Sequence, residues 1–173
     1  MTATAVSDFY EIDAQKRLHV NLHYGQTEVL DIIDTEWDTV RVIGVGAGWQ
    51  SGKTLMGPVY LKYCMDRRND EGKRGTVTEP LDFVAVSGTY DLLRLKMLPA
   101  LEGLFCHYLG WGDYSASDKI IYSKDRLSRI ILRSADSRIG LESFTAQDGW
   151  FDEAGRDEVP ITAYESIMRG LAV

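Results

Sequence analysis

The sequence is poor in the residues that build disulfide frameworks, metal centres and membrane spans. It has only two cysteines and three histidines among 173 residues. Cys64 and Cys106 lie inside apolar helical patterns, which predicts buried, reduced thiols rather than a disulfide or a zinc site. No apolar run approaches the roughly 20 residues that a membrane-spanning helix needs, and the polar, acidic N-terminus does not resemble a signal peptide. We therefore expect a cytosolic protein that has no membrane partner.

The chain also lacks an excess of positive charge. Its 19 lysines and arginines face 26 aspartates and glutamates, which gives a formal net charge of −7. A strongly basic composition would have indicated nucleic-acid binding, and that argument does not apply here, although an acidic chain can still carry a local basic face. The length and the 45% of hydrophobic residues fit one compact domain with a sizeable core.

The rest of the sequence is organised around residues 42–54, which read VIGVGAGWQSGKT. The apolar residues at 42–45 predict a short buried strand, the glycines predict a turn, and the apolar spacing after Lys53 predicts a helix. This succession is typical of a phosphate-binding loop (P-loop, or Walker A). Its small residues let several backbone N–H groups converge on one anion, and the helix N-terminus adds partial positive charge.

The loop departs from the pattern G-x-x-x-x-G-K-[ST] at one position, because Ala47 stands where the first glycine is expected. The glycines on either side of Ala47 can supply the missing backbone freedom. Lys53 is predicted to reach the β and γ phosphates of a nucleotide, and the Thr54 hydroxyl to bind Mg²⁺. The predicted nucleotide-binding residues of the loop are Gly48, Trp49, Gln50, Ser51, Gly52, Lys53 and Thr54.

A glutamine upstream of the loop is a candidate for recognising adenine. Gln26 stands just before a short predicted helix whose apolar residues lie at 29–33. Its side-chain amide offers one donor and one acceptor, which match N6 and N7 of adenine. A surface glutamine without such a role is the competing interpretation.

The remaining elements follow from apolar periodicity and turn residues. We predict that residues 81–86 form a strand ending in the polar cluster 87–90, where a parallel strand would deliver residues to a ligand. Asp91 is expected to cap the helix that follows. We further predict a kink or an early irregular turn at the Gly57–Pro58 step, and a helix over 92–105 that Pro99 kinks or divides. A loop at 110–113, a hairpin of 119–122 with 127–132 and a helix over 161–171 are also predicted.

An acidic pair, Asp152 and Glu153, follows the short apolar segment 149–151. An aspartate at the end of an apolar strand can hold a metal ion, as in a Walker B motif, and a neighbouring glutamate can polarise water for attack on the γ-phosphate. We expect Asp152 to be the metal ligand and Glu153 the catalytic base. Phosphoryl transfer needs further positive charge. The candidates are Arg133, Arg138, Arg156 and Arg169, of which Arg138 is favoured.

These segments together resemble the N-terminal ATPase domain of large terminase subunits, the motors that package DNA into tailed phages. The resemblance rests on residues 24–26, on the loop AGWQSGKT at 47–54 and on the strand and turn at 84–90. It also rests on RIILRSADSRIG at 129–140 and WFDEAGRD at 150–157. The order and spacing agree over about residues 20–173.

The resemblance implies an α/β fold: a P-loop NTPase core with a mainly parallel sheet flanked by helices, of the additional-strand branch shared with helicases and recombinases. It implies an ATPase domain over 21–173, with ATP and Mg²⁺ as cofactors. Residues 1–20 alternate apolar and charged residues without a clear period, and we predict that they form a lead-in that packs on this domain. It also implies hydrolysis coupled to movement of double-stranded DNA in the host cytoplasm, in a homo-oligomeric ring on the portal protein with a small terminase subunit as a further partner. A neighbouring subunit would donate an arginine, and Arg138 matches that position best.

Two departures from the family pattern limit what can be carried over. Trp49 stands where many members have an arginine, so the role of that arginine cannot be transferred. The sequence ends before the strand expected to carry the ATPase coupling motif, so we expect a domain truncated at its C-terminus and predict no nuclease activity for it. The alternatives are another helicase-like ATPase that acts on nucleic acid, and a nucleotide-binding assembly module that does not hydrolyse ATP.

Overall fold

The computed structural model describes residues 9–15, 17–40, 42–46, 52–137, 141, 144–155 and 159–171. The chain forms two compact units, Met1–Met56 and Gly57–Val173, and each unit is described by itself. None of the described helices is both long and apolar enough to cross a membrane. The loop residues at 47–51, and Arg138 and Arg156, lie outside the described residues.

The first unit begins with a small antiparallel hairpin that the sequence did not predict. Strand β1 (Tyr10–Ile12) pairs with β2 (Leu18–Val20), and the Tyr10 side chain is buried. Asp13 stabilises the turn by accepting hydrogen bonds from the backbone N–H of Arg17 and from its Nε atom, and by contacting His19. These hydrogen bonds, with that to His19 the largest cause, lower the pKa of Asp13 to about 2.

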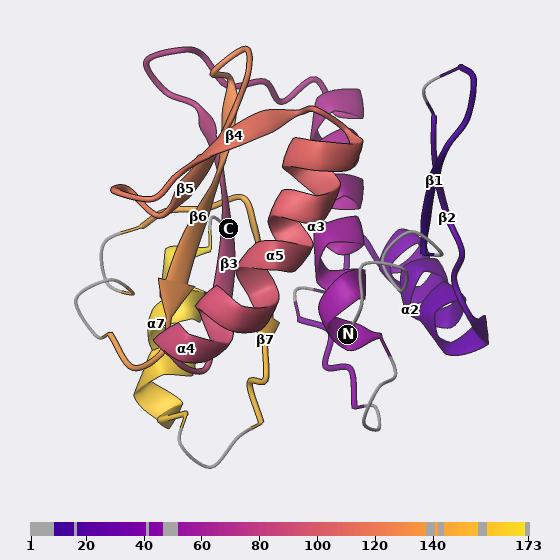
Figure 1. Ribbon diagram of the computed structural model, residues 1–173. Coiled ribbons are helices and arrows are strands. Elements are labelled where there is room, and N and C mark those ends of the chain that lie inside the picture. Colours follow the sequence, from indigo (N-terminus) through magenta and orange to yellow (C-terminus); the bar gives the residue numbers. More distant parts are fainter. Residues whose placement is uncertain are drawn as a thin grey trace. The chain divides into compact units, whose positions relative to one another are not determined.

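Two helices flank the loop in sequence (Figure 1). Helix α2 (Tyr24–Thr35) contains the predicted apolar stretch, but of its four apolar residues at 29–33 only Ile33 is fully buried. Helix α3 (Lys53–Asp70) is assigned continuously through Gly57 and Pro58, so the chain forms no irregular turn at that step. Pro58 lies in the second turn, so its ring disturbs the helix only near its N-terminal end.

The second unit is built on a five-stranded sheet of order β4-β5-β6-β3-β7. The central strand β3 (Leu81–Ser87) pairs in parallel with β6 (Ser128–Ser134) on one side and with β7 (Asp148–Asp152) on the other. Strands β4 (Gly112–Ser115), β5 (Ile120–Ser123) and β6 pair antiparallel. The sheet is therefore mixed, and the prediction of a mainly parallel sheet was wrong because β4 and β5 form an antiparallel extension at one edge.

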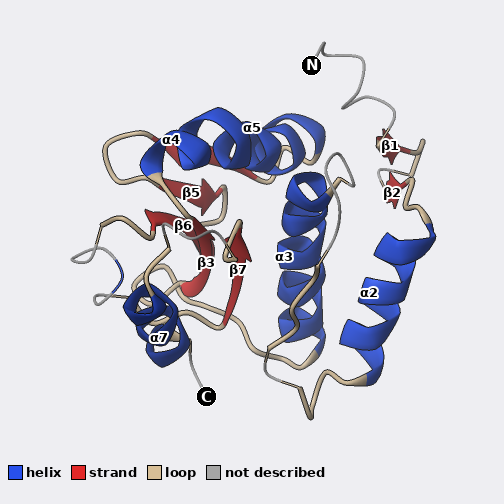
Figure 2. Cartoon of the chain, turned by 90° about the horizontal axis from the view of Figure 1, so that it is seen from below, coloured by secondary structure: helices blue, strands red, loops and turns tan. Residues whose placement is uncertain are grey.

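Helices cover both faces of this sheet (Figure 2). On one face, helix α7 (Ile161–Gly170) packs Ala163 and Ile167 into a core that includes Val84 and Val86 of β3. Side chains alternate along a strand, so Phe83 and Ala85 point to the opposite face. The five most buried residues of β3, at 83–87, are nearly inaccessible, as expected for a central parallel strand covered on both sides.

The connection between β3 and β4 is helical but irregular. It consists of α4 (Tyr90–Leu92), a π-helical segment η1 (Leu93–Met97), α5 (Leu98–Leu101) and a second π-helical segment η2 (Glu102–Tyr108). Thr89, not the predicted Asp91, caps its start, since the Thr89 hydroxyl accepts the backbone N–H of Leu92 at 3.3 Å. The predicted loop at 110–113 ends earlier than expected, because Gly112 and Asp113 begin β4.

The strand predicted at 42–45 is not formed. Residues 42–46 have no regular structure and join neither sheet, and Val42, Ile43 and Val45 are 45%, 37% and 48% exposed. An apolar run becomes a strand only where a neighbouring edge can pair its backbone N–H and C=O groups. Local composition therefore identified the segment as apolar but did not determine its pairing.

Two contacts join helix α3 to strand β7, one near the start of the helix and one near its end. Near the start of the helix, the indole of Trp150 lies against the Cα of Gly57, and a Cβ added there would be 2.0 Å from a ring carbon. Near its end, Arg68 donates two hydrogen bonds of 2.9 Å to the carboxylate of Asp148. Both cysteines are free thiols, but of the two predicted to be buried only Cys64, on the same helix, is buried, whereas Cys106 is partly exposed. Burial raises the pKa of the Cys64 thiol.

Candidate active site

The first part of the candidate site is the start of helix α3. Gly52 has φ of +76°, a left-handed conformation that favours glycine, and its carbonyl oxygen accepts hydrogen bonds from the backbone N–H groups of Leu55 and Met56. Lys53 and Thr54 are thus the first two residues of the helix. This arrangement presents backbone donors, an ammonium and a hydroxyl at a helix N-terminus, as anion binding requires.

Gln26 lies against this turn. Its side chain is 6% exposed, its Oε1 accepts the backbone N–H of His23 at 3.1 Å, and its Nε2 is 2.8 Å from the position of a Cβ built on Gly52. The glutamine therefore links the N-terminus of α2 to the glycine that precedes Lys53. In this conformation Oε1 of Gln26 is already hydrogen-bonded to the backbone of His23, and Nε2 is the side-chain atom closest to the Cβ position of Gly52.

The second part is the carboxyl edge of the parallel strands. The register places Ser87 of β3 opposite both Ser134 of β6 and Asp152 of β7. All three residues are polar and almost fully buried, with exposures of 1%, 6% and 6%. Ligands of open α/β sheets bind outside the carboxyl ends of such strands, so the structure places Asp152 where a bound ligand is expected.

Glu153 follows directly and has an unusual backbone conformation. Its φ is +58°, which non-glycine residues adopt rarely and at a cost of about 1–2 kcal/mol. Its carbonyl oxygen lies near Gly88 at the end of β3, and its Oε1 is 3.9 Å from Nζ of Lys96 on the π-helical segment η1. Backbone strain of this kind is concentrated at functional sites.

This strain leads to a prediction about stability. Replacing Glu153 by Gly should raise the free energy of unfolding by about 0.5–1 kcal/mol, because glycine adopts positive φ without steric cost. Glu153→Ala is the matched control, since it removes the same side chain but keeps the Cβ. Chemical denaturation of the two variants measures the difference. A Gly variant no more stable than the Ala variant would show that the backbone at 153 is unstrained.

The two side chains that the sequence predicts as Mg²⁺ ligands are Thr54 and Asp152. Mg²⁺ prefers oxygen ligands and usually takes one or two from protein side chains, with phosphates and water supplying the rest. Asp152 in the second unit and Thr54 in the first offer a carboxylate and a hydroxyl of this kind. The described residues contain no group of three or more His, Cys, Asp or Glu side chains able to hold a metal ion.

The arginines considered as further positive charges differ in their surroundings. Arg133, in β6, donates a hydrogen bond to the carbonyl oxygen of Leu132, and burial lowers its pKa. Arg169 lies on α7 and contacts the hydroxyl of Ser166 at 3.4 Å. The favoured Arg138, and Arg156, fall outside the described residues.

Sequence reasoning missed three polar residues at the same edge. Ser134 ends the apolar run of β6, and that position could have identified it, as it did Ser87. Asp136 accepts the backbone N–H of Tyr90 at 3.3 Å and so joins the turns after β6 and β3. Lys96 approaches Glu153 only through the fold, so no local signal in the sequence indicates it.

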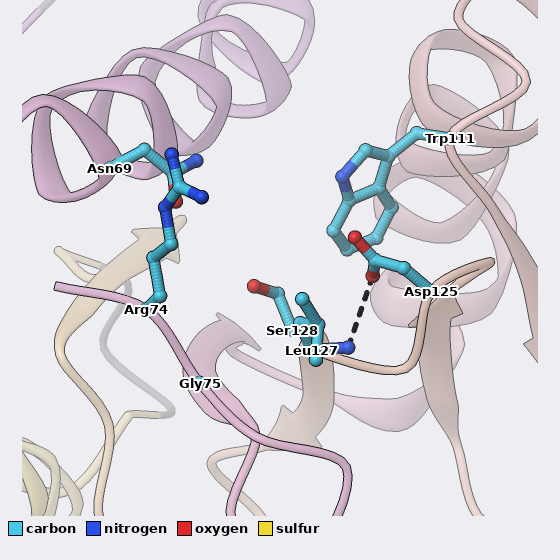
Figure 3. Close-up of a pocket in the computed structure, with 7 residues that line it drawn as sticks. All are labelled: Asn69, Arg74, Gly75, Trp111, Asp125, Leu127 and Ser128. Atoms are coloured by element: carbon cyan, nitrogen blue, oxygen red, sulfur yellow. Dashed lines mark hydrogen bonds between the residues drawn. The ribbon is translucent and has the colours of Figure 1, made fainter. Parts of the chain in front are cut away.

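A separate cleft of about 290 Å³ lies at the opposite edge of the sheet, beside the start of β6 (Figure 3). Asn69 and Arg74 face Trp111 and Asp125 across it. Asp125 accepts hydrogen bonds from the Ser123 hydroxyl and from the backbone N–H of Leu127, so it stabilises the β5–β6 turn. None of the catalytic, nucleotide-binding or metal-binding residues predicted from the sequence lines this cleft. Its lining is Asn69, Arg74, Gly75, Trp111, Asp125, Leu127 and Ser128.

Comparisons with known proteins identify the fold. No family model matches the sequence, and no curated protein matches it either. Among solved structures, the large terminase of a thermophilic bacteriophage is similar, with a TM-score of 0.65 and 18% sequence identity. The similarity covers 88% of this chain and 36% of the phage protein, so the chain spans about a third of that protein's length. The chain thus has an α/β fold with a five-stranded mixed sheet that matches part of a large terminase.

Proposed function

We propose that this chain is the ATPase part of a viral DNA-packaging motor, in which hydrolysis of ATP drives double-stranded DNA into a procapsid. In this proposal the loop residues 48–52, with Lys53 and Thr54, bind the phosphates, and Gln26 lies on the adenine side. Thr54 and Asp152 hold Mg²⁺, and Glu153 activates the attacking water.

The observation that carries the proposal is the placement of Asp152 and Glu153. A buried carboxylate ends strand β7 at the carboxyl edge of the sheet, beside Ser87, and a glutamate held in a left-handed turn follows it. Two adjacent carboxylates then have different surroundings, one buried and one part-exposed, which suits a metal ligand followed by a base. The likeness to a large terminase supports the same interpretation.

The proposal includes the partners and setting of such a motor. They are double-stranded DNA, a portal protein, a small terminase subunit and further copies of this chain in a ring, in the cytoplasm of an infected host. Arg138 would reach the nucleotide of a neighbouring copy in that ring. No nuclease activity is proposed for these 173 residues.

The test is whether double-stranded DNA stimulates ATP hydrolysis. We expect turnover by the chain to rise on addition of portal-bearing procapsids and double-stranded DNA, and to rise with protein concentration more steeply than linearly, because a neighbouring copy donates an arginine. Turnover is measured as phosphate release at several protein concentrations, and single-stranded DNA of equal length is the control.

The alternatives predict other outcomes. Stimulation by single-stranded DNA alone would indicate a helicase-like ATPase rather than a packaging motor. Tight binding of ATP without turnover under every condition would indicate an assembly module that binds nucleotide but does not hydrolyse it. Specific activity independent of dilution would exclude an arginine supplied by a second copy.

A further inference from the structure

The side chain that approaches the candidate base is a lysine from another element. The carboxylate Oε1 of Glu153 lies 3.9 Å from Nζ of Lys96, and the two side chains are 34% and 55% exposed. This ion pair connects the described residues of η1, where Lys96 lies, to the turn that follows β7, where Glu153 lies. The two residues are 57 positions apart in the sequence, since 153 − 96 = 57, so only the fold brings them together.

The position of Lys96 is set by buried neighbours. In the π-helical segment η1, Leu93 and Met97 are buried at 2% and 0% exposure, whereas Arg94, Leu95 and Lys96 between them are exposed. The two buried anchors therefore fix the segment against the sheet and direct the intervening residues outward. π-Helical turns are rare and are often found at functional sites.

Glu153 is constrained in a complementary way. Its backbone is held in a left-handed turn whose carbonyl oxygen lies near Gly88. Its side chain still has rotatable bonds, so the backbone alone does not orient the carboxylate. Pairing one carboxylate oxygen with Lys96 leaves the other oxygen available for water, as a base requires.

We propose that Lys96 is a positioning residue for Glu153, with its ammonium orienting the carboxylate toward the attacking water. The inference rests on the proposed function, because it assigns Lys96 a role in the same hydrolytic step. Lys96 acts through Glu153 and need not touch the nucleotide. Its loss should therefore lower the rate of hydrolysis and leave nucleotide binding unchanged.

The test compares Lys96→Met with Arg94→Met, in the full 173-residue chain with its DNA and procapsid partners. Arg94 is an exposed cation on the same segment, and the structure pairs Glu153 with Lys96 rather than with Arg94, so Arg94→Met removes the same charge without removing that ion pair. We expect Lys96→Met to lower kcat for ATP about two- to fivefold with KM unchanged, the range that a part-exposed ion pair can supply. Lys96→Arg should restore kcat, and Arg94→Met should match the parent.

Two further measurements separate positioning from other roles. In a Glu153→Gln background, Lys96→Met should cause no additional loss, because the carboxylate that it orients is gone. The ¹³C resonance of the Glu153 carboxyl should move in Lys96→Met and not in Arg94→Met, whatever the turnover of the chain. This second readout does not depend on catalysis.

Each outcome has a defined meaning. Unchanged kcat in Lys96→Met together with an unmoved Glu153 resonance overturns the inference, and so does an equal loss in Arg94→Met. A fall in melting temperature and in nucleotide affinity in Lys96→Met would show a structural role instead. If Glu153→Gln itself hydrolyses ATP at the parent rate, the proposed function fails, which is a different result from the failure of Lys96 alone.

Discussion

Glu153→Gln should reduce ATP hydrolysis by about 10²–10⁴-fold while the chain still binds Mg-ATP. The amide has the shape of the carboxylate but cannot accept a proton from the attacking water. The left-handed backbone at this position is kept, because glutamine and glutamate meet the same steric limit at positive φ. Phosphate release measures turnover, and titration with a fluorescent ATP analogue measures binding.

Two comparison variants make this result specific. Glu165→Gln changes an exposed glutamate on α7 and should behave as the parent does. Lys53→Ala should weaken nucleotide binding itself, because it removes the cation expected at the β and γ phosphates. Binding retained in Glu153→Gln and lost in Lys53→Ala would separate the catalytic group from the binding group. Equal turnover in both variants and the parent would remove the catalytic assignment of Glu153.

Gly57→Ala should destabilise the chain by about 2–3 kcal/mol, although alanine ordinarily favours a helix over glycine. A Cβ at position 57 would lie 2.0–2.2 Å from atoms of the Trp150 indole, so the ring or the helix must move. The melting temperature of a chain of this size should fall by about 4–12 °C. Thermal unfolding followed by circular dichroism measures the change.

The structure supplies a matched control and a rescue for this variant. Gly103, in the π-helical segment η2, has no atom within 4 Å of the position that an added methyl would take, so Gly103→Ala should be neutral or stabilising by up to about 1 kcal/mol. Combining Gly57→Ala with Trp150→Leu removes the ring that causes the clash. We expect the double variant to be at least about 1 kcal/mol more stable than the sum of the single changes predicts. Strict additivity would contradict the packing of Trp150 on Gly57.

Local periodicity predicted most of the second unit. The strand at 81–86, the hairpin around residues 124–126 and the helix after Pro160 are all present, and the apolar segment 149–151 belongs to β7. The strands are short apolar runs and the helix has a period of 3.6, all bounded by turn residues, and their partners lie within the same unit. The prediction failed for residues 42–45, where strand formation depends on hydrogen bonds to a distant segment.

The sequence by itself determined which residues are candidates for the chemistry, because Gly-Lys-Thr at a helix start and Asp-Glu after an apolar strand are local patterns with a specific chemical meaning. It also determined that the chain contains both strands and helices. Only the tertiary structure decided that Ser87, Ser134 and Asp152 meet at one sheet edge, that Glu153 has positive φ and that Lys96 reaches it. Strand order and side-chain approach depend on contacts between residues far apart in the chain, and no local pattern encodes them.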